Sequence, residues 1–263
     1  MTDLVVRKIG WEFDATVPFL WQPDNPDFSI FGNAFTFIAN NKSLLFDKAV
    51  QQLWISAIAL TISIVIAVPL GVWLGHIHRG SFAAINISNV GRALPSLAVI
   101  AIAIAPLGLG RGTLLLALVV LAVPPILTNA YAAVDGVDRD IVDAARGMGL
   151  RERDILFGTE LPLALPLLFG GIRTAAVYIV ATVPLGALVG TEGGLGEIIA
   201  NQASYRLAGV IAAAICVAIV ALIVDLVFAV LQRAVTPRGL RGQIDFAAVQ
   251  TAAAGNPQEE GTP

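Results

Sequence analysis

The chain has 263 residues, of which 57% are hydrophobic and only 13% are charged, and its mean hydropathy is +0.80. Soluble domains carry about 25% charged residues, so this composition excludes an ordinary soluble protein and indicates a membrane protein. One cysteine and two histidines exclude a disulfide framework and a Cys/His zinc site, and we expect no bound metal. The net charge of −3, without a basic patch that contains aromatic residues, excludes a nucleic-acid partner.

Charged residues are crowded into a few places, and the gaps between them have the length of membrane spans. About 20 apolar residues, each rising about 1.5 Å, cross the hydrocarbon core of a bilayer. The sequence therefore predicts an all-α membrane protein with about five transmembrane helices, at about 50–75, 88–107, 112–133, 162–189 and 207–232, in a transmembrane domain over 49–232. Prolines inside several spans free backbone groups, so we expect these helices to pack against protein.

Lysine and arginine near the span ends predict the orientation, because cytoplasmic loops carry an excess of them. With the N-terminus outside, the inner side holds Arg79, Arg92, Arg139, Arg146, Arg151, Arg153, Arg233, Arg238 and Arg241. The outer side near the spans then holds only Lys42, Lys48, Arg111 and Arg206. We therefore expect a multi-pass protein of the inner (cytoplasmic) membrane with an external N-terminus and a cytoplasmic C-terminus.

The two ends of the chain differ in composition. Residues 1–48 place tryptophans and phenylalanines between acidic residues and prolines, which predicts an extracellular segment at the membrane interface and no cleaved signal peptide. The alternative is a loosely ordered leader with no role. Residues 233–263 lack a hydrophobic face, and we expect a disordered cytoplasmic tail.

The long charged stretch between two spans, 135–162, has the pattern of two short helices that form an elbow over about 138–158. Three aspartates lie near the start of the first helix, where the helix dipole favours negative charge: Asp138, Asp140 and Asp143. Helical spacing places four side chains on one apolar face: Ile141, Ala144, Ala145 and Met148. Gly147 and Gly149 allow a sharp break before a second helix, from Leu150 to about Gly158. Periodicity alone would also fit a solvated loop.

This elbow resembles the EAA motif of ABC importer permeases, E-A-A-x3-G-x9-I-x-L-P. The matching residues are Asp143, Ala144, Ala145, Gly149, Leu161 and Pro162, with Asp143 in place of Glu and Thr159 in place of Ile. ALPSLAVIAIAIAPLG at 93–108, ELPLALPLLFGGIRTAAV at 160–177 and LVGTEGGLGEII at 188–199 resemble the osmoprotectant branch, which handles glycine betaine, choline and carnitine. The resemblance covers about 50–232.

The resemblance implies a non-enzymatic transport subunit that works with several partners. These are cytoplasmic ATPase subunits, a second permease copy or paralogue, an extracellular or periplasmic solute-binding protein and the lipid membrane. The residues implied in ATPase coupling are Asp143, Ala144, Ala145, Gly147, Gly149, Leu161 and Pro162. No lysine follows a glycine, so the chain has no P-loop, and we expect ATP and Mg²⁺ on the partner and no cofactor on this chain.

Polar residues inside the spans are candidates for the solute path. Ser96, Asn129, Thr174, Tyr178 and Thr182 could line it, although Ser and Thr in spans also bond within a bundle. Since the spans offer few aromatic residues, an aromatic cage for a quaternary amine should belong to the binding protein. We expect Asp225 to pack against a neighbouring subunit or polar backbone, and Arg173 to bond to backbone carbonyls or an acidic partner.

Other features leave alternatives open. Gly193, Gly194 and Gly196, beside Glu192 and Glu197, could form either a contact for the binding protein or a plain turn. His76 and His78 are interpreted as interfacial residues, with no carboxylate or serine placed for triad chemistry. Two alternatives to an osmoprotectant permease are an ABC permease for another small solute, such as an amino acid, and a secondary transporter that works alone.

Overall fold

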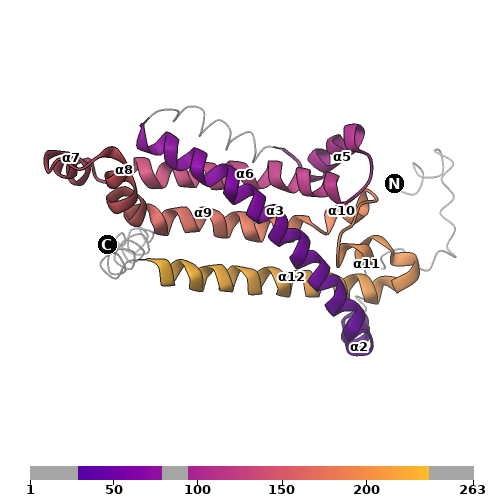
Figure 1. The fold of residues 1–263 in the computed structure, drawn as a ribbon. Helices are drawn as coiled ribbons and strands as arrows, with labels where there is room; N and C mark the ends of the chain where they lie inside the picture. The colour runs from indigo at the N-terminus through magenta and orange to yellow at the C-terminus, as the bar shows by residue number, and fades with distance from the viewer. Residues whose placement is uncertain (1–28, 79–93, 237–263) are drawn as a thin grey trace, which may run out of the picture.

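The computed structural model describes residues 29–78 and 94–236, and every regular element in these ranges is helical (Figure 1). Within these two ranges, four helices have the length and hydropathy to cross a membrane. They are α3 (Lys42–His76), α6 (Arg111–Asp135), the segment from α8 (Glu152–Ile155) through a π-turn η2 (Leu156–Glu160), α9 (Leu161–Thr182) and α10 (Leu185–Leu188), and α12 (Gln202–Val235). The predicted all-α membrane class is confirmed.

Helix boundaries differ from the expected spans in three places. The first long helix begins at Lys42 rather than near 50, and α2 (Ser29–Asn40) lies within the segment expected at the interface. The second span is represented by α5 (Ser96–Leu107), which is too short to cross a bilayer by itself; residues 88–93 lie outside the described residues. The fourth span ends at Thr182, and α10 follows after a turn. Residues 1–28 and 237–263 also lie outside the described residues.

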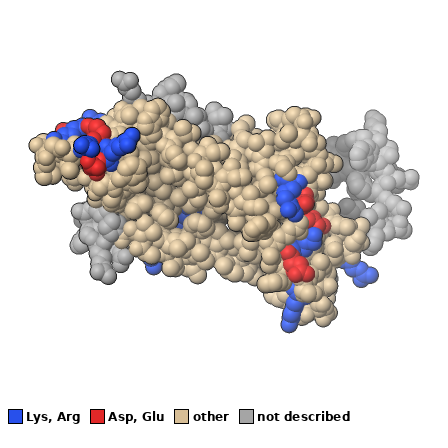
Figure 2. Space-filling model, viewed as in Figure 1, with Lys and Arg blue, Asp and Glu red and all other residues tan. Residues whose placement is uncertain are grey.

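Helices α6, α9 and α12 run roughly parallel and α3 crosses them obliquely, so the shorter elements gather at two ends (Figure 1). The elbow helix α7 (Arg139–Gly147) and α8 lie at the end where α3, α6 and α12 finish and α9 begins. At the opposite end lie α2, α5, α10 and α11 (Gly196–Ala200). Figure 2 shows charged side chains mainly at these two ends, with a band of uncharged residues between them. This distribution is the one that a bilayer requires.

Helix α3 packs closely on α6 through two glycines four residues apart, Gly71 and Gly75. A Cβ built on Gly71 would lie 2.6 Å from Cβ of Ala130 and 2.7 Å from the carbonyl oxygen of Leu127. A Cβ on Gly75 would lie 2.8 Å from the carbonyl oxygen of Tyr131. Small residues at this spacing let helix backbones approach closely in a membrane. This contact fixes the end of α3, and therefore His76, against the end of α6.

A buried glutamine compensates for a proline at the opposite end of the bundle. Pro184 has no N–H, so the carbonyl of Val180 lacks its helical donor. The Nε2 of Gln52, on α3, donates to that carbonyl at 2.9 Å, and its side chain is fully buried. The expectation that prolines in the spans require protein neighbours is met here by a side chain from another helix.

Candidate functional site

The first helix of the elbow, α7, is capped at both ends. At its start, a side-chain oxygen of Asp138 accepts a hydrogen bond from the backbone N–H of Asp140 at 2.9 Å. At its end, the N–H of Gly149 donates to the carbonyl of Arg146 at 2.9 Å and the N–H of Leu150 donates to that of Ala145 at 3.3 Å. This pair of bonds is a Schellman motif, and Gly149 has the left-handed φ of +82° that the motif requires. The predicted break at Gly149 is confirmed.

The apolar residues of α7 point in two directions. Val142 and Ala145 are buried against the bundle, whereas Ala144 is exposed and Ile141 and Met148 are 44% and 75% exposed. Ile141, Ala144 and Met148 therefore form an exposed apolar surface on the side of the elbow that faces away from the bundle.

The second half of the elbow continues without interruption into a membrane helix. The expected separate helix, Leu150 to about Gly158, is instead α8 followed by the π-turn η2, which runs directly into α9. Leu161 and Pro162 are the first residues of α9, so the missing N–H of Pro162 falls at the junction with the π-turn, where the N–H of Leu161 donates to the carbonyl of Leu156. Helices α8 and α9 are thus joined in one continuous helical path.

Side chains also join the two helices of the elbow, α7 and α8. Nε and Nη2 of Arg146 donate to the two carboxylate oxygens of Glu152 at 2.9 and 3.2 Å, and Nη1 lies 3.5 Å from Oδ1 of Asp143. The hydrogen bond to Glu152 is the main cause that raises the pKa of Arg146 above its already high ordinary value, and the negative charge of Glu152 adds to it. The guanidinium is therefore charged at every physiological pH.

Replacing Asp138 with alanine should destabilise α7 by about 1 kcal/mol, because the backbone N–H of Asp140 loses its acceptor. Asp138→Asn retains a side-chain oxygen and should be close to the parent. Asp140→Ala serves as the control, since Asp140 contributes its backbone rather than its carboxylate to the cap. Hydrogen exchange of the α7 amides measures the difference; equal protection in Asp138→Ala and Asp140→Ala would contradict the prediction.

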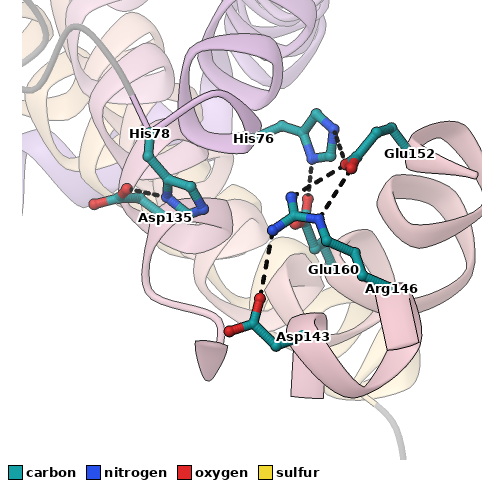
Figure 3. Close-up of polar contacts among 7 residues, drawn as sticks. All are labelled: His76, His78, Asp135, Asp143, Arg146, Glu152 and Glu160. Atoms are coloured by element: carbon teal, nitrogen blue, oxygen red, sulfur yellow. Dashed lines mark hydrogen bonds and ion pairs between the residues drawn. The ribbon is translucent and has the colours of Figure 1, made fainter. Parts of the chain in front are cut away.

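Both histidines have carboxylate partners, which the sequence did not predict. Nδ1 of His78 lies 2.7 Å from Oδ1 of Asp135, at the end of α6. His76 contacts two glutamates, one from the elbow and one from the start of α9 (Figure 3). Sequence reasoning missed these pairs because the partners are far away along the chain and only the packing of α3 brings them together.

The polar residues proposed for the path do not share one surface. Thr174 and Tyr178, one helical turn apart on α9, are exposed in the chain. Thr182 is buried, and its hydroxyl donates to the carbonyl of Tyr178 at 2.7 Å. Asn129 donates to the carbonyl of Pro125 at 2.7 Å and packs against Gly171, while Ser96 begins α5.

Two charged residues at membrane depth form an ion pair with each other. Nε and Nη2 of Arg173, on α9, donate to Oδ1 and Oδ2 of Asp225, on α12, at 2.6 and 2.7 Å. The acidic partner expected for Arg173 is therefore present. Asp225, for which the sequence predicted a contact with a neighbouring subunit or polar backbone, is paired within its own chain with the guanidinium on α9. Side chains paired in this way face a protein interior or a polar cavity rather than lipid.

At the opposite end of the bundle, the three glycines of the sequence motif lie in a tightly packed turn. A Cβ on Gly196 would lie 2.2 Å from the carbonyl oxygen of Pro184, and one on Gly194 would lie 2.7 Å from Cβ of Gln52. A Cβ on Gly193 would similarly meet Ala187. These contacts account for the glycines by packing.

The charged residues beside this turn are paired and line an open groove. Nε of Arg111 donates to Glu192 at 2.9 Å, and Lys48 forms an ion pair with Glu197. The groove, of about 470 Å³, is lined by Ala187, Gly190, Thr191, Glu192, Glu197, Ala200 and Asn201. Among residues 29–78 and 94–236, no cluster of His, Cys, Asp and Glu is arranged to hold a metal ion.

Comparison with known proteins gives a consistent result. The family model for the binding-protein-dependent transport system inner membrane component matches residues 67–238. The glycine betaine/carnitine/choline transport system permease protein OpuCB of Bacillus subtilis is 38% identical over 208 residues, which are 79% of this chain and 95% of that protein. The osmoprotectant import permease protein OsmW of Salmonella typhimurium is 31% identical over 211 residues, 78% of this chain and 98% of that protein.

A solved structure has the same fold. The chain matches the MetNI methionine ABC transporter in an inward-facing conformation with a TM-score of 0.65 and 22% identity, over 75% of this chain and 99% of the matched one. At this identity the likeness shows the arrangement of the helices alone.

Proposed function

Since the chain belongs to the family of binding-protein-dependent inner membrane components of ABC importers, we propose that it is the permease for osmoprotectants such as glycine betaine, choline and carnitine. It is a multi-pass inner-membrane protein and a transport subunit rather than an enzyme. The proposed solutes are those that the names of several relatives specify. The resemblance of segments 93–108, 160–177 and 188–199 to the osmoprotectant branch supports the same proposal.

The elbow is the proposed contact with a cytoplasmic ATPase, and its geometry is the observation that carries this part of the proposal. The exposed Ile141, Ala144 and Met148 offer an apolar face, and Asp143, 72% exposed, offers a charge beside it. Gly149 holds α7 at an angle to α8, so a partner that grips α7 pulls on the helical path to α9. ATP and Mg²⁺ would bind to the partner. A cytoplasmic elbow also requires the orientation with an external N-terminus and a cytoplasmic C-terminus.

The opposite end is the proposed contact with the solute-binding protein. The groove beside Glu192 and Glu197 is open, and its charged walls are held by Arg111 and Lys48. Thr174 and Tyr178 are proposed to face the solute path, which a second permease copy or paralogue would close. The Arg173–Asp225 pair lies on adjacent helices and supports a polar environment between the two permeases.

The proposal is tested by isolating the intact chain together with the subunits encoded beside it. We expect an ATPase to be recovered with the permease, and its ATP hydrolysis in proteoliposomes to rise when binding protein and glycine betaine, choline or carnitine are added. Stimulation by an amino acid instead would replace the osmoprotectant assignment with the alternative permease. Transport by this chain alone, driven by an ion gradient and without ATPase, would contradict the proposal.

A further inference from the structure

His76 is the last residue of α3, and its side chain contacts the elbow and the start of α9 (Figure 3). Its Nδ1 is 2.6 Å from Oε2 of Glu160, and its Nε2 is 3.5 Å from Oε2 of Glu152. Glu160 belongs to the π-turn that begins α9, and Glu152 is the first residue of α8. One imidazole therefore connects the end of α3 to both ends of the continuous segment formed by α8 and η2.

Glu160 depends on this imidazole. Its side chain is only 1% exposed, and its Oε1 has no hydrogen-bond partner in the part of the chain that the structure describes. Its Oε2 bonds to His76. A buried carboxyl group without a partner is strongly unfavourable, so the position of Glu160 and that of the end of α3 are tied together.

The other contact of His76 reaches the elbow. Glu152 is itself held by the two-pronged contact from Arg146 on α7, so a continuous series of polar contacts runs from Arg146 through Glu152 and His76 to Glu160 (Figure 3). The end of α3 cannot yield freely, because Gly75 fixes it against the backbone of α6. A displacement of α7 must then either move α3 together with α9 or break the contact between His76 and Glu152.

We propose that His76 is a positioning residue that couples movement of the elbow to α3 as well as to α9. This inference rests on the proposed function, in which an ATPase moves α7. The continuous helix gives α9 its own connection to α8, and His76 supplies the second connection, to the helix that packs along α6. The two connections make the inner ends of three membrane helices move as one unit.

The chemistry of asparagine allows the two contacts of His76 to be separated. The side-chain nitrogen of asparagine is bonded to Cγ, as Nδ1 of histidine is, so His76→Asn retains a donor for Glu160 and removes the reach to Glu152. Glu152→Gln retains the size of that side chain and removes its charge, which weakens its contacts with both His76 and Arg146. His78→Asn is the matched control, because His78 pairs with Asp135 and does not touch the elbow.

The measurements use the complete transporter with its ATPase and binding protein in proteoliposomes, and record basal ATP hydrolysis and solute moved per ATP. In His76→Asn and Glu152→Gln we expect normal basal hydrolysis and a fall in solute moved per ATP of about 2- to 30-fold, the range found for residues that carry coupling. His78→Asn should match the parent in both measurements. If His76 served only as the hydrogen-bond partner of Glu160, His76→Asn would match the parent in both measurements.

Unchanged solute per ATP in both variants would overturn the inference. So would the loss of bound ATPase in His76→Asn, because His76 would then serve docking rather than transmission. If His76→Asn cannot be recovered in the membrane, Glu152→Gln decides by the same ratio. Failure of the proposed function is a different result, since the parent complex would then lack ATP-driven uptake before any residue was changed.

Discussion

Replacing Gly149 with valine is expected to abolish ATP-driven uptake while leaving the membrane helices intact. Gly149 has a φ of +82°, and an L-residue with a side chain pays about 1–2 kcal/mol for the left-handed region, with a β-branched residue at the upper end. The Schellman motif would open, and α7 would lose its angle to α8. Uptake and the recovery of ATPase with the permease measure the effect.

Gly147→Val is the control for this prediction. Gly147 ends the same helix, and a Cβ on either glycine would meet nothing within 4 Å, so steric crowding is excluded at both positions. Of these two glycines, only Gly149 has a positive φ. At Gly147, which is helical, valine has the higher helix propensity. Gly147→Val should therefore retain uptake; equal loss in both variants would mean that α7 tolerates no added side chain and that backbone conformation is not the cause.

Gly71→Leu is expected to destabilise the folded bundle by roughly 3 kcal/mol, the upper part of the usual range for overpacking. The first added carbon would already lie 2.6 Å from Cβ of Ala130 and 2.7 Å from a backbone oxygen. Because the backbone atoms of α6 cannot move aside as a flexible side chain can, α3 and α6 must separate. The loss of thermal stability in detergent, expected at roughly 5–10 °C, is the measurement.

Gly112→Leu is the matched control, because Gly112 lies in the first turn of α6 and a Cβ there would meet nothing within 4 Å. Leucine is also the better helix former, so this variant should be at least as stable as the parent. A melting temperature for Gly71→Leu equal to that of Gly112→Leu would show that the close approach of α3 and α6 is not needed for stability.

Several parts of the fold and the site could be predicted from residues close together in the sequence. Long gaps between charges predicted the membrane helices, because the bilayer excludes charge regardless of how helices pack. Asp138 and Gly149 predicted the ends of α7, because caps depend on residues within one turn of the helix end. The EAA-like residues of the elbow led to the permease family, which the family match over 67–238 confirms.

Contacts between distant residues could not be predicted in the same way. Arg173 and Asp225, as well as His76 and Glu160, come from different helices, and no local pattern specifies which helices are neighbours. The first long helix also begins before the apolar run, at Lys42, where polar residues are paired across the fold: Lys48 with Glu197 and Gln51 with Glu192. Those pairings exist only once residues 192–197 lie beside α3.

The sequence by itself determined the class of the protein, the approximate spans, the elbow and its glycine break, since each depends on the solvent or on neighbours within a turn. Only the tertiary structure decided that α8 runs through a π-turn into α9, that Gly71 and Gly75 bring α3 onto α6, and that His76 reaches the elbow. The physical reason is that the apolar surfaces of membrane helices are nearly interchangeable, so partner choice rests on a few small and polar side chains whose meeting depends on the whole bundle.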